Sequence, residues 1–234
     1  MEGTIYNALS QTLTHNYTIN ANGWNSPWER RALLQEFKAK KIQVALIQET
    51  HYKTNQIPKF YDKYDSTIIH SPPSPPQSTK IRGAAIALAN NLQLEIRAAN
   101  TDPQGNDTFL KGKLNSLTYT FASIYLPGTE QTDIMNKIHD LLLLFAEGML
   151  IVGGDSNTPL EPKLDCSSGT SSLPFKQIKR LKQQLHWLQL LDSWRILHPQ
   201  DKNGSFYSHS HDTYDSTQKA AIGAITWPDH APVG

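Results

Sequence analysis

The 234-residue sequence contains a single cysteine, Cys166. One cysteine excludes an internal disulfide and a zinc site built from several thiolates, and this fits a reducing, intracellular compartment. No apolar run approaches the roughly 18 residues that a membrane-spanning helix needs, so we expect no membrane segment. The first residues, Met1-Glu2-Gly3-Thr4, lack the basic flank and apolar stretch of a secretory signal.

An excess of charge is also absent, since 22 basic residues face 21 acidic residues and the formal net charge is +1. Composition therefore gives no support for nucleic-acid binding, although it leaves room for a local basic patch. Hydrophobic residues make up 38% and charged residues 18%, which is typical of a soluble globular protein. A chain of this length forms a single α/β domain of ordinary size.

Periodicity and punctuation predict the elements of this domain. Helical spacing of apolar residues is present at 27–40, 131–146 and 172–188. Short apolar runs predict strands at 17–20, 44–48, 66–70, 83–89, 92–98, 108–114, 118–125, 149–152, 205–208 and 221–227. Many short strands with few helices predict a layered α/β or α+β sandwich and fit a purely parallel sheet poorly. Because no helix joins 83–89 to 92–98, this pair predicts an antiparallel hairpin.

Polar clusters follow several of the apolar runs. Asp155 and Asn157, in a Gly-Asp-Ser-Asn segment, follow the apolar residues 149–152. On an extended backbone, residues i and i+2 point the same way, so both side chains would share one side of a strand end. The same spacing relates Asn20 and Asn22. A turn is the alternative for both pairs, because Gly, Asp, Ser and Asn all favour turns.

Three further clusters contain Glu49, Tyr125 and the pair Asp229-His230. A carboxylate at a strand end, such as Glu49, needs a cation, a hydrogen-bond donor or a metal; a salt bridge is the simplest alternative. Tyr125 alone is typical of a core tyrosine with a satisfied hydroxyl. His230 is the residue type whose pKa near neutrality suits acid–base catalysis, and an exposed terminal pair is the alternative.

Together these clusters fit metal-assisted hydrolysis of a phosphoester. Glu49 with Asn20 could hold a hard divalent ion such as Mg²⁺, which prefers oxygen ligands. The ion would polarise a phosphoryl oxygen and stabilise the leaving oxyanion. Asp155 would orient or deprotonate a water, or protonate the leaving group. The groups expected to contact the phosphate oxygens are Asn157, Tyr125 and His230.

The order of these motifs resembles the endonuclease/exonuclease/phosphatase superfamily, which includes deoxyribonuclease I and the apurinic/apyrimidinic endonucleases. It is particularly similar to the endonuclease domain of LINE-type, non-long-terminal-repeat retrotransposons. The resemblance extends over nearly the whole chain from about Tyr17 onward. The residues that carry it are Asn20-Ala21-Asn22-Gly23, Arg30-Arg31-Ala32-Leu33-Leu34, Ile47-Gln48-Glu49-Thr50-His51, Gly83-Ala84-Ala85-Ile86, Ile124-Tyr125-Leu126-Pro127, Gly154-Asp155-Ser156-Asn157-Thr158-Pro159-Leu160, Leu197-His198-Pro199 and Asp229-His230.

The resemblance implies a four-layered α/β sandwich, with two packed mixed β-sheets flanked by helices, formed by residues 16–234 after a tail of residues 1–15. It implies a Mg²⁺-dependent endonuclease, with Mn²⁺ as an alternative cofactor, that nicks double-stranded DNA to prime reverse transcription. In relatives the domain is part of a larger reverse-transcriptase polyprotein and acts in the nucleus. The isolated domain is expected to be monomeric and to bind no membrane.

The resemblance also assigns roles by position. The residues matched to catalysis are Asp155, His230, Asn157 and Tyr125. The residues matched to metal binding are Glu49, Asn20 and Asp229. The residues matched to DNA contacts are Asn22 and Ser205.

The sequence departs from the family pattern at several positions, and relative to the family the domain is shorter near residues 215–220 and at the C-terminus. Gly128 replaces the asparagine that usually follows Tyr-x-Pro, and Pro228 replaces the serine before Asp-His. Gln218 stands where the family has the aspartate that orients the catalytic histidine, with Asp215 as the nearest substitute. Two alternatives therefore stand beside the DNA endonuclease: a phosphatase or exonuclease on the same scaffold, and a truncated copy that cuts nothing.

Overall fold

The computed structural model describes residues 14–24, 26–52, 66–71, 82–128, 131–166, 168–171, 173–202, 206–208, 213–215 and 224–226. The elements in chain order are β1 (Asn16–Asn20), α2 (Pro27–Ala39), β2 (Val44–Gln48), β3 (Ser66–Ser71), β4 (Ala84–Ala89), β5 (Glu95–Thr101), β6 (Asp107–Leu114), β7 (Leu117–Tyr125), α3 (Gln131–Phe145), β8 (Met149–Asp155), α4 (Pro162–Asp165), α5 (Phe175–Trp187), α6 (Ser193–Leu197), β9 (Phe206–Ser208), β10 (Thr213–Asp215) and β11 (Ala224–Thr226).

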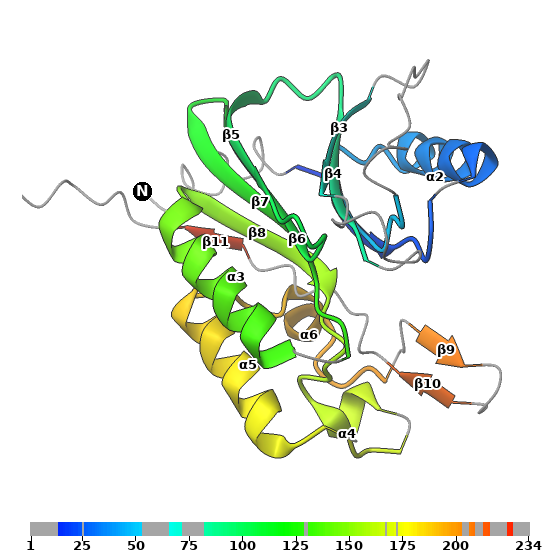
Figure 1. The fold of residues 1–234 in the computed structure, drawn as a ribbon, viewed down its shortest axis with the longest axis vertical. Helices are drawn as coiled ribbons and strands as arrows, with labels where there is room; N and C mark the ends of the chain where they lie inside the picture. Colours follow the sequence, from blue (N-terminus) through cyan, green and yellow to red (C-terminus); the bar gives the residue numbers. More distant parts are fainter. Residues whose placement is uncertain are drawn as a thin grey trace, which may run out of the picture.

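Two mixed sheets form the centre of the molecule (Figure 1). The first has the strand order β1-β2-β4-β3, and the second has the order β11-β8-β7-β6-β5; β9 and β10 form a separate two-stranded ribbon. Within the two sheets, β1 pairs with β2 and β7 pairs with β8 in parallel, and the other pairs are antiparallel. The mixed sheets confirm that a purely parallel arrangement is excluded.

Three hydrophobic cores separate four layers. The core between the sheets contains Leu46, Ile86, Leu110, Phe121 and Ile151. A second core lies between the first sheet and α2, and a third lies between the second sheet and the pair α3 and α5. Figure 1 shows these helices on the outer faces of their sheets. The predicted four-layered α/β sandwich is confirmed.

Helix α2 shows how local sequence sets an element. Ser26 precedes the helix with extended φ and ψ, and its backbone N–H donates to Glu29 Oε2 at 3.3 Å. Pro27 occupies the first turn, where its missing N–H is not needed. Leu34 and Phe37 are buried against the first sheet. The helix spans the predicted segment to within one residue.

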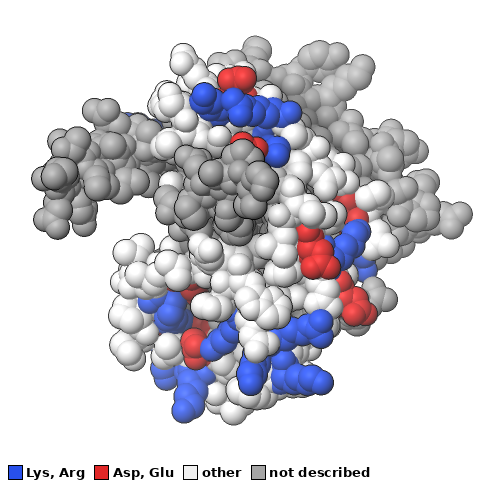
Figure 2. Space-filling view, turned by 90° about the vertical axis from the view of Figure 1, so that its left-hand side faces the viewer, with Lys and Arg blue, Asp and Glu red and all other residues white. Residues whose placement is uncertain are grey.

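The outer face of α5 is a local basic surface in a nearly neutral chain. The helix contains four exposed cations and no acidic residue: Lys176, Lys179, Arg180 and Lys182. Figure 2, which views the face formed by α3 and α5, shows basic side chains gathered over its lower part. Lys182 pairs with Glu161 at 2.5 Å. The basic residues of 172–188 therefore face outward, as the helical periodicity predicts.

The predicted hairpin of 83–89 with 92–98 is wrong. β4 lies in the first sheet and β5 lies in the second, so the chain crosses between sheets here. A tight turn does exist, because Leu92 N donates to Ala89 O at 2.9 Å. Leu92 is then buried in the core between the sheets, and β5 begins only at Glu95. A short connection thus marks a turn without showing whether the flanking strands pair.

Strand β8 is longer than predicted, because it continues through Gly153 and Gly154 to Asp155. These glycines mark close packing and not a turn. A Cβ at Gly153 would lie 2.7 Å from Leu46 Cδ1, and one at Gly154 would lie 2.3 Å from the carbonyl oxygen of Ile124. Only glycine lets β8 run this close to both neighbours. The elements that the sequence patterns missed are α4, α6 and β10.

Candidate active site

Strands from both sheets end at one edge of the sandwich. In the first sheet, Asn20 at the end of β1 pairs with Gln48 at the end of β2. In the second sheet, Tyr125 at the end of β7 pairs with Asp155 at the end of β8. Both pairs are parallel, so each pair presents its carboxyl ends together. A hydrogen bond from Asn20 Nδ2 to Asp155 Oδ2, at 2.8 Å, joins the two sheets at this edge.

Asn20 bridges the two carboxylates of this edge. Its Nδ2 donates to Glu49 Oε1 at 3.0 Å as well as to Asp155. Its Oδ1 accepts from the backbone N–H of Asn22 at 2.8 Å, which sets the orientation of the amide. A single side chain thus brings Glu49 and Asp155 together from different sheets, as the order of the sequence motifs predicts.

The Glu49 carboxylate is 19% exposed and is surrounded by polar partners. His51 Nε2 lies 3.2 Å from Glu49 Oε2. The Tyr125 hydroxyl lies close enough that burial first, and then the charge and hydrogen bonding of Glu49, raise its pKa well above the ordinary value. Tyr125 therefore stays protonated and acts as a hydrogen-bond donor beside the carboxylates.

Asp155 is almost completely buried, with 2% of its surface exposed. Its Oδ1 accepts from the backbone N–H of Asn157 at 3.0 Å. Burial raises the pKa of Asp155, and the charge of Glu49 adds to this effect, while the hydrogen bonds from Asn20 and Asn157 oppose it; the net shift is upward. A buried carboxyl with a raised pKa beside a second carboxylate is suited to exchanging protons.

Both predicted i, i+2 pairs form turns in the structure, so the expectation of an extended backbone is wrong. Asn22 has φ +44° and Asn157 has φ +45°, both in the left-handed region. In each pair the side-chain oxygen of the first residue accepts the N–H of the second. Asn157 Nδ2 donates to the carbonyl oxygen of Leu126 at 2.9 Å. The second residue of each pair therefore positions the first, and Asn22 is itself exposed.

Backbone strain is concentrated at this edge. Nine described non-glycine residues have positive φ. Five of them belong to this edge: Glu49 itself and its neighbours Asn22, His51, Arg82 and Asn157. Such conformations cost on the order of 1–3 kcal/mol each and persist only where the surroundings impose them, often at functional sites. The distribution supports this edge as the functional site.

Three residues near the carboxylates have no role in the sequence prediction: His51, Arg82 and Asn106. His51 belongs to the Gln-Glu-Thr-His segment, so its position was available from sequence. Arg82 Nη1 donates to Asn106 Oδ1 at 3.3 Å, and the carbonyl oxygen of Asn106 accepts from Tyr125 N at 2.7 Å. No pattern in the sequence marks Arg82 or Asn106, because the contact depends on a turn between β5 and β6.

Comparison with known proteins now gives the fold its name. No protein-family model matches the sequence. An AP endonuclease from Archaeoglobus fulgidus superposes with a TM-score of 0.64 at 16% identity, covering 89% of this chain and 84% of that one. The endonuclease domain of TRAS1, a telomere-specific non-LTR retrotransposon, gives 0.59 at 17% identity, covering 91% and 84%. The chain has the deoxyribonuclease I-like fold.

Other structures with the deoxyribonuclease I-like fold differ in activity. A 3′-5′ exonuclease, NExo from Neisseria meningitidis, matches with a TM-score of 0.63 at 13% identity, covering 89% of this chain and 85% of that one. A NExo structure bound to a product DNA hairpin is described as a 3′ phosphatase. The matched structures belong to the endonuclease/exonuclease/phosphatase superfamily, and the fold that they share with this chain is the fold that the resemblance implied.

Two of the three predicted metal-binding residues, Glu49 and Asn20, lie in the described part of the chain. The carboxylate oxygens of Glu49, and those of the predicted catalytic residue Asp155 beside it, are of the type that a hard divalent cation prefers. Asn20 presents Nδ2 to both carboxylates, and its Oδ1 accepts from Asn22. Among the described residues, no three His, Cys, Asp or Glu side chains form a metal-binding group.

Ser205, Asp229 and His230 lie outside the described residues, so their assigned roles stay predictions. The last described strand before Asp229 in the chain is β11 (Ala224–Thr226). It runs antiparallel to β8 and pairs Thr226 with Met149. Met149 is the first residue of β8, whereas Asp155 is the last.

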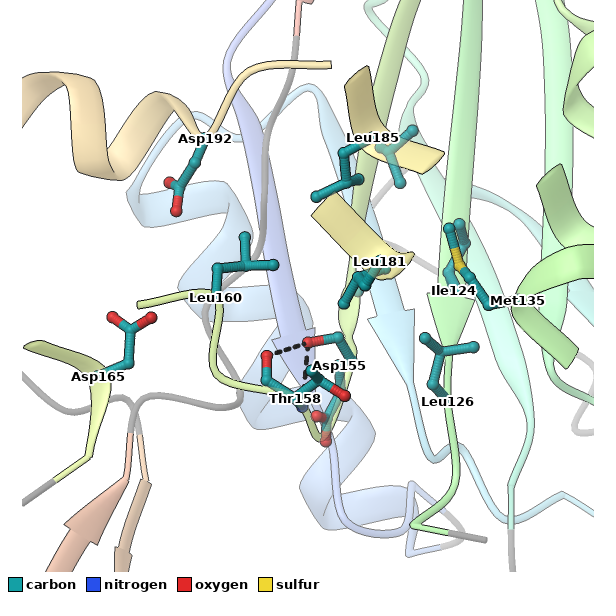
Figure 3. Close-up of a pocket in the computed structure, with 13 residues that line it drawn as sticks. Ile124, Leu126, Met135, Asp155, Thr158, Leu160, Asp165, Leu181, Leu185 and Asp192 are labelled. Carbon is teal, nitrogen blue, oxygen red and sulfur yellow. Dashed lines mark hydrogen bonds between the residues drawn. The ribbon is translucent and has the colours of Figure 1, made fainter. Parts of the chain in front are cut away.

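A cavity of about 60 Å³ lies between the second sheet and α5 (Figure 3). Figure 3 shows Leu181 and Leu185 from α5 on one side of it, and Asp155 and Thr158 at one end. Because a water occupies about 30 Å³ of liquid, this space equals about two waters and is too small for a nucleotide. Within the described residues, no helix is long and apolar enough to cross a membrane.

Proposed function

We propose that the protein is a metal-dependent endonuclease that nicks double-stranded DNA by phosphodiester hydrolysis. The observation that carries the proposal is the Asn20 amide, which joins the Glu49 and Asp155 carboxylates across two sheets. The neutral donor Tyr125 stands beside them. The fold supports the proposal, because matched structures include AP endonucleases and a retrotransposon endonuclease domain.

In this proposal, Glu49 and the predicted ligand Asp229 would hold Mg²⁺ or Mn²⁺, while Asn20 positions the Glu49 carboxylate through Nδ2. When bound, the ion supplies Lewis-acid polarisation of a phosphoryl oxygen. Asp155 orients the attacking water and accepts its proton, for which a raised pKa is favourable. The Tyr125 hydroxyl donates to a non-bridging phosphate oxygen.

The bond changes balance as follows. The oxygen of water bonds to phosphorus, and the bond between phosphorus and the 3′ oxygen breaks. The 3′ oxyanion takes up a proton, and we assign His230 as its donor because histidine is the residue type suited to acid–base catalysis. The products are 5′-phosphate and 3′-hydroxyl ends. The 3′-hydroxyl is the end that a polymerase extends, which supports a role in priming reverse transcription within a larger polyprotein in the nucleus.

Nicking of supercoiled plasmid with Mg²⁺, with Mn²⁺ and with EDTA tests this function. Asp155→Asn and Glu49→Gln each keep the shape of the side chain and remove its charge, and we expect each to reduce nicking by at least about 100-fold. Asp140→Asn is the matched control, because Asp140 is 77% exposed on α3. Equal nicking by all four proteins would refute the site. His230→Ala tests the assigned proton donor separately.

A second candidate function is exonuclease or 3′-phosphatase activity, which the match to NExo favours. Plasmid nicking, release of phosphate from a 3′-phosphorylated duplex, and shortening of a blunt duplex separate the three activities in parallel assays. Nicking without the other two supports the endonuclease. A cooperative thermal melt with none of the three activities would support the truncated, inactive copy.

A further inference from the structure

The described edge contains two carboxylates, yet the proposed substrate is a polyanion. Glu49 and Asp155 would repel a phosphate at the same place where it must bind. A bound divalent cation offsets this charge only at its own position. A substrate phosphate next to the scissile one would need a cation supplied by the protein.

Arg82 is the arginine that the structure brings to this edge. It directly precedes Gly83, and the backbone of both residues is joined to the segment that follows Glu49: Thr50 N donates to Gly83 O and His51 N donates to Arg82 O, each at 3.0 Å. The positive charge of Arg82 also reaches the Tyr125 hydroxyl, where it lowers the pKa against the larger upward effect of burial. Arg82 therefore lies beside His51 and Tyr125, the two residues that flank the carboxylates.

A chain of hydrogen bonds holds the guanidinium from behind. Arg82 Nη1 donates to Asn106 Oδ1 at 3.3 Å. The backbone N–H and Nδ2 of Asn106 both donate to the same oxygen of Asp102, at 3.0 and 2.8 Å. Lys137 Nζ donates to the other oxygen of Asp102 at 2.8 Å. Burial acts to raise the pKa of Asp102, but these hydrogen bonds and the charge of Lys137 hold that pKa below its usual range. The Asp102 carboxylate, which anchors Asn106, therefore stays ionised.

This arrangement leaves the guanidinium equipped to bind an anion. A guanidinium has five N–H donors in a planar fork, and one of them is directed to Asn106 among the described residues. The side chain is partly exposed. A guanidinium that is held through one of its donors is suited to the bidentate recognition of phosphate oxygens.

We propose that Arg82 forms a phosphate-binding subsite for the backbone phosphate of the DNA strand next to the scissile one, with Asn106 as the positioning residue for Arg82. The subsite rests on the proposed nuclease function and defines how that function grips its substrate. It neutralises one phosphate and sets the register of the strand along the carboxylates.

The test compares Arg82→Gln and Arg82→Lys with Arg97→Gln. Arg97 is exposed on the edge strand β5, three strands from β8, so its substitution makes the same chemical change away from the site. Steady-state nicking of a short duplex gives kcat and KM. Binding of the same duplex in the Asp155→Asn background, over a series of NaCl concentrations, gives the salt dependence without cleavage.

We expect Arg82→Gln to raise the Kd and KM by about 10- to 100-fold, the effect of losing one charge-assisted hydrogen-bond pair. Its slope of log affinity against log salt should fall by about 0.9, the value for one phosphate. Arg82→Lys keeps the charge, so the slope is retained while KM takes an intermediate value. Arg97→Gln should change neither quantity.

Equal behaviour of Arg82→Gln and Arg97→Gln would overturn the subsite, and so would a fall in kcat at unchanged KM and slope. Arg82→Lys is the variant that decides if Arg82→Gln fails to fold in a thermal melt. The two proposals fail separately: binding that depends on Arg82 without any cleavage keeps the subsite and refutes the nuclease. Normal nicking by Arg82→Gln keeps the nuclease and refutes the subsite.

Discussion

Asp107, the first residue of β6, makes a sharp prediction about stability and pH. It is buried, with 1% of its surface exposed, and neither carboxylate oxygen has a hydrogen-bond partner among the described residues. Burial first, and then the charge of Asp102, raise its pKa to about 7 from an ordinary value of 3.8, against the opposing charge of Lys137. A native carboxyl that titrates near neutrality should make the folded state sensitive to pH.

The sign follows from proton binding in the two states. Below about pH 4 the carboxyl is protonated in both the folded and the unfolded chain. Between about pH 4 and 7 the unfolded chain releases the proton while the native state keeps it, so the free energy of unfolding falls by about 1.4 kcal/mol per pH unit. Above about pH 7 the loss levels off at no more than about 4 kcal/mol. This is a large part of the stability of an ordinary domain.

Urea denaturation of the unmodified protein and of Asp107→Asn at several pH values measures this loss. Asparagine mimics the protonated carboxyl, so the two proteins should have nearly equal stability only below about pH 4, where Asp107 is protonated in both the folded and the unfolded chain. At pH 8 the variant should be more stable, by up to about 4 kcal/mol. Subtracting the two free energies of unfolding at each pH cancels the titration of other groups. The exposed Asp140→Asn variant is the control, and its difference from the unmodified protein should not change with pH. For Asp107→Asn, a difference that does not change with pH would refute the reasoning.

Three further predictions concern the scaffold of the site. Gly154→Ala should destabilise the protein by more than about 3 kcal/mol in a denaturant melt, because its Cβ would lie 2.3 Å from a backbone oxygen, whereas Gly128→Ala, with open space around it, should not. Gln48→Ala should cost about 1–3 kcal/mol, because it removes the buried bond from Nε2 to Ser123 Oγ at 3.0 Å; unchanged stability would contradict this. Val152→Ile adds one methylene beside the 60 Å³ cavity and should raise the melting temperature slightly without changing nicking.

Much of the fold was predictable because local signals agreed with tertiary burial. The segment 44–48 reads as a buried strand, and every residue of β2 is buried. The helix at 131–146 has apolar residues on one stripe, and Ile134, Ile138 and Leu142 are buried in α3. Where an apolar period matches the layer that it faces, the sequence contains enough information to place the element.

The misses have a common cause, which is that partner choice is non-local. Nothing between Ala89 and Leu92 shows that the next strand joins another sheet. Gly153 and Gly154 have the composition of a turn, although they extend β8 because its neighbours come too close for a Cβ. Arg82 likewise gains its position from a contact with Asn106, a residue 24 positions away in the chain. Such features depend on how the layers meet, which periodicity does not encode.

The Gly-Asp-Ser-Asn segment shows why a turn and a catalytic site were not true alternatives. Asn157 adopts φ +45° and its backbone N–H donates to Asp155 Oδ1, which is an Asx-turn. That same bond uses one oxygen of Asp155 and directs the other to Asn20. On the opposite sheet, Asn22 binds Asn20 in the same way. Each strand end therefore uses a tight turn to hold a polar side chain in one orientation, and the two oriented side chains meet across the sheets. Residue types that favour turns suit these positions because the turn fixes the orientation of the polar side chain.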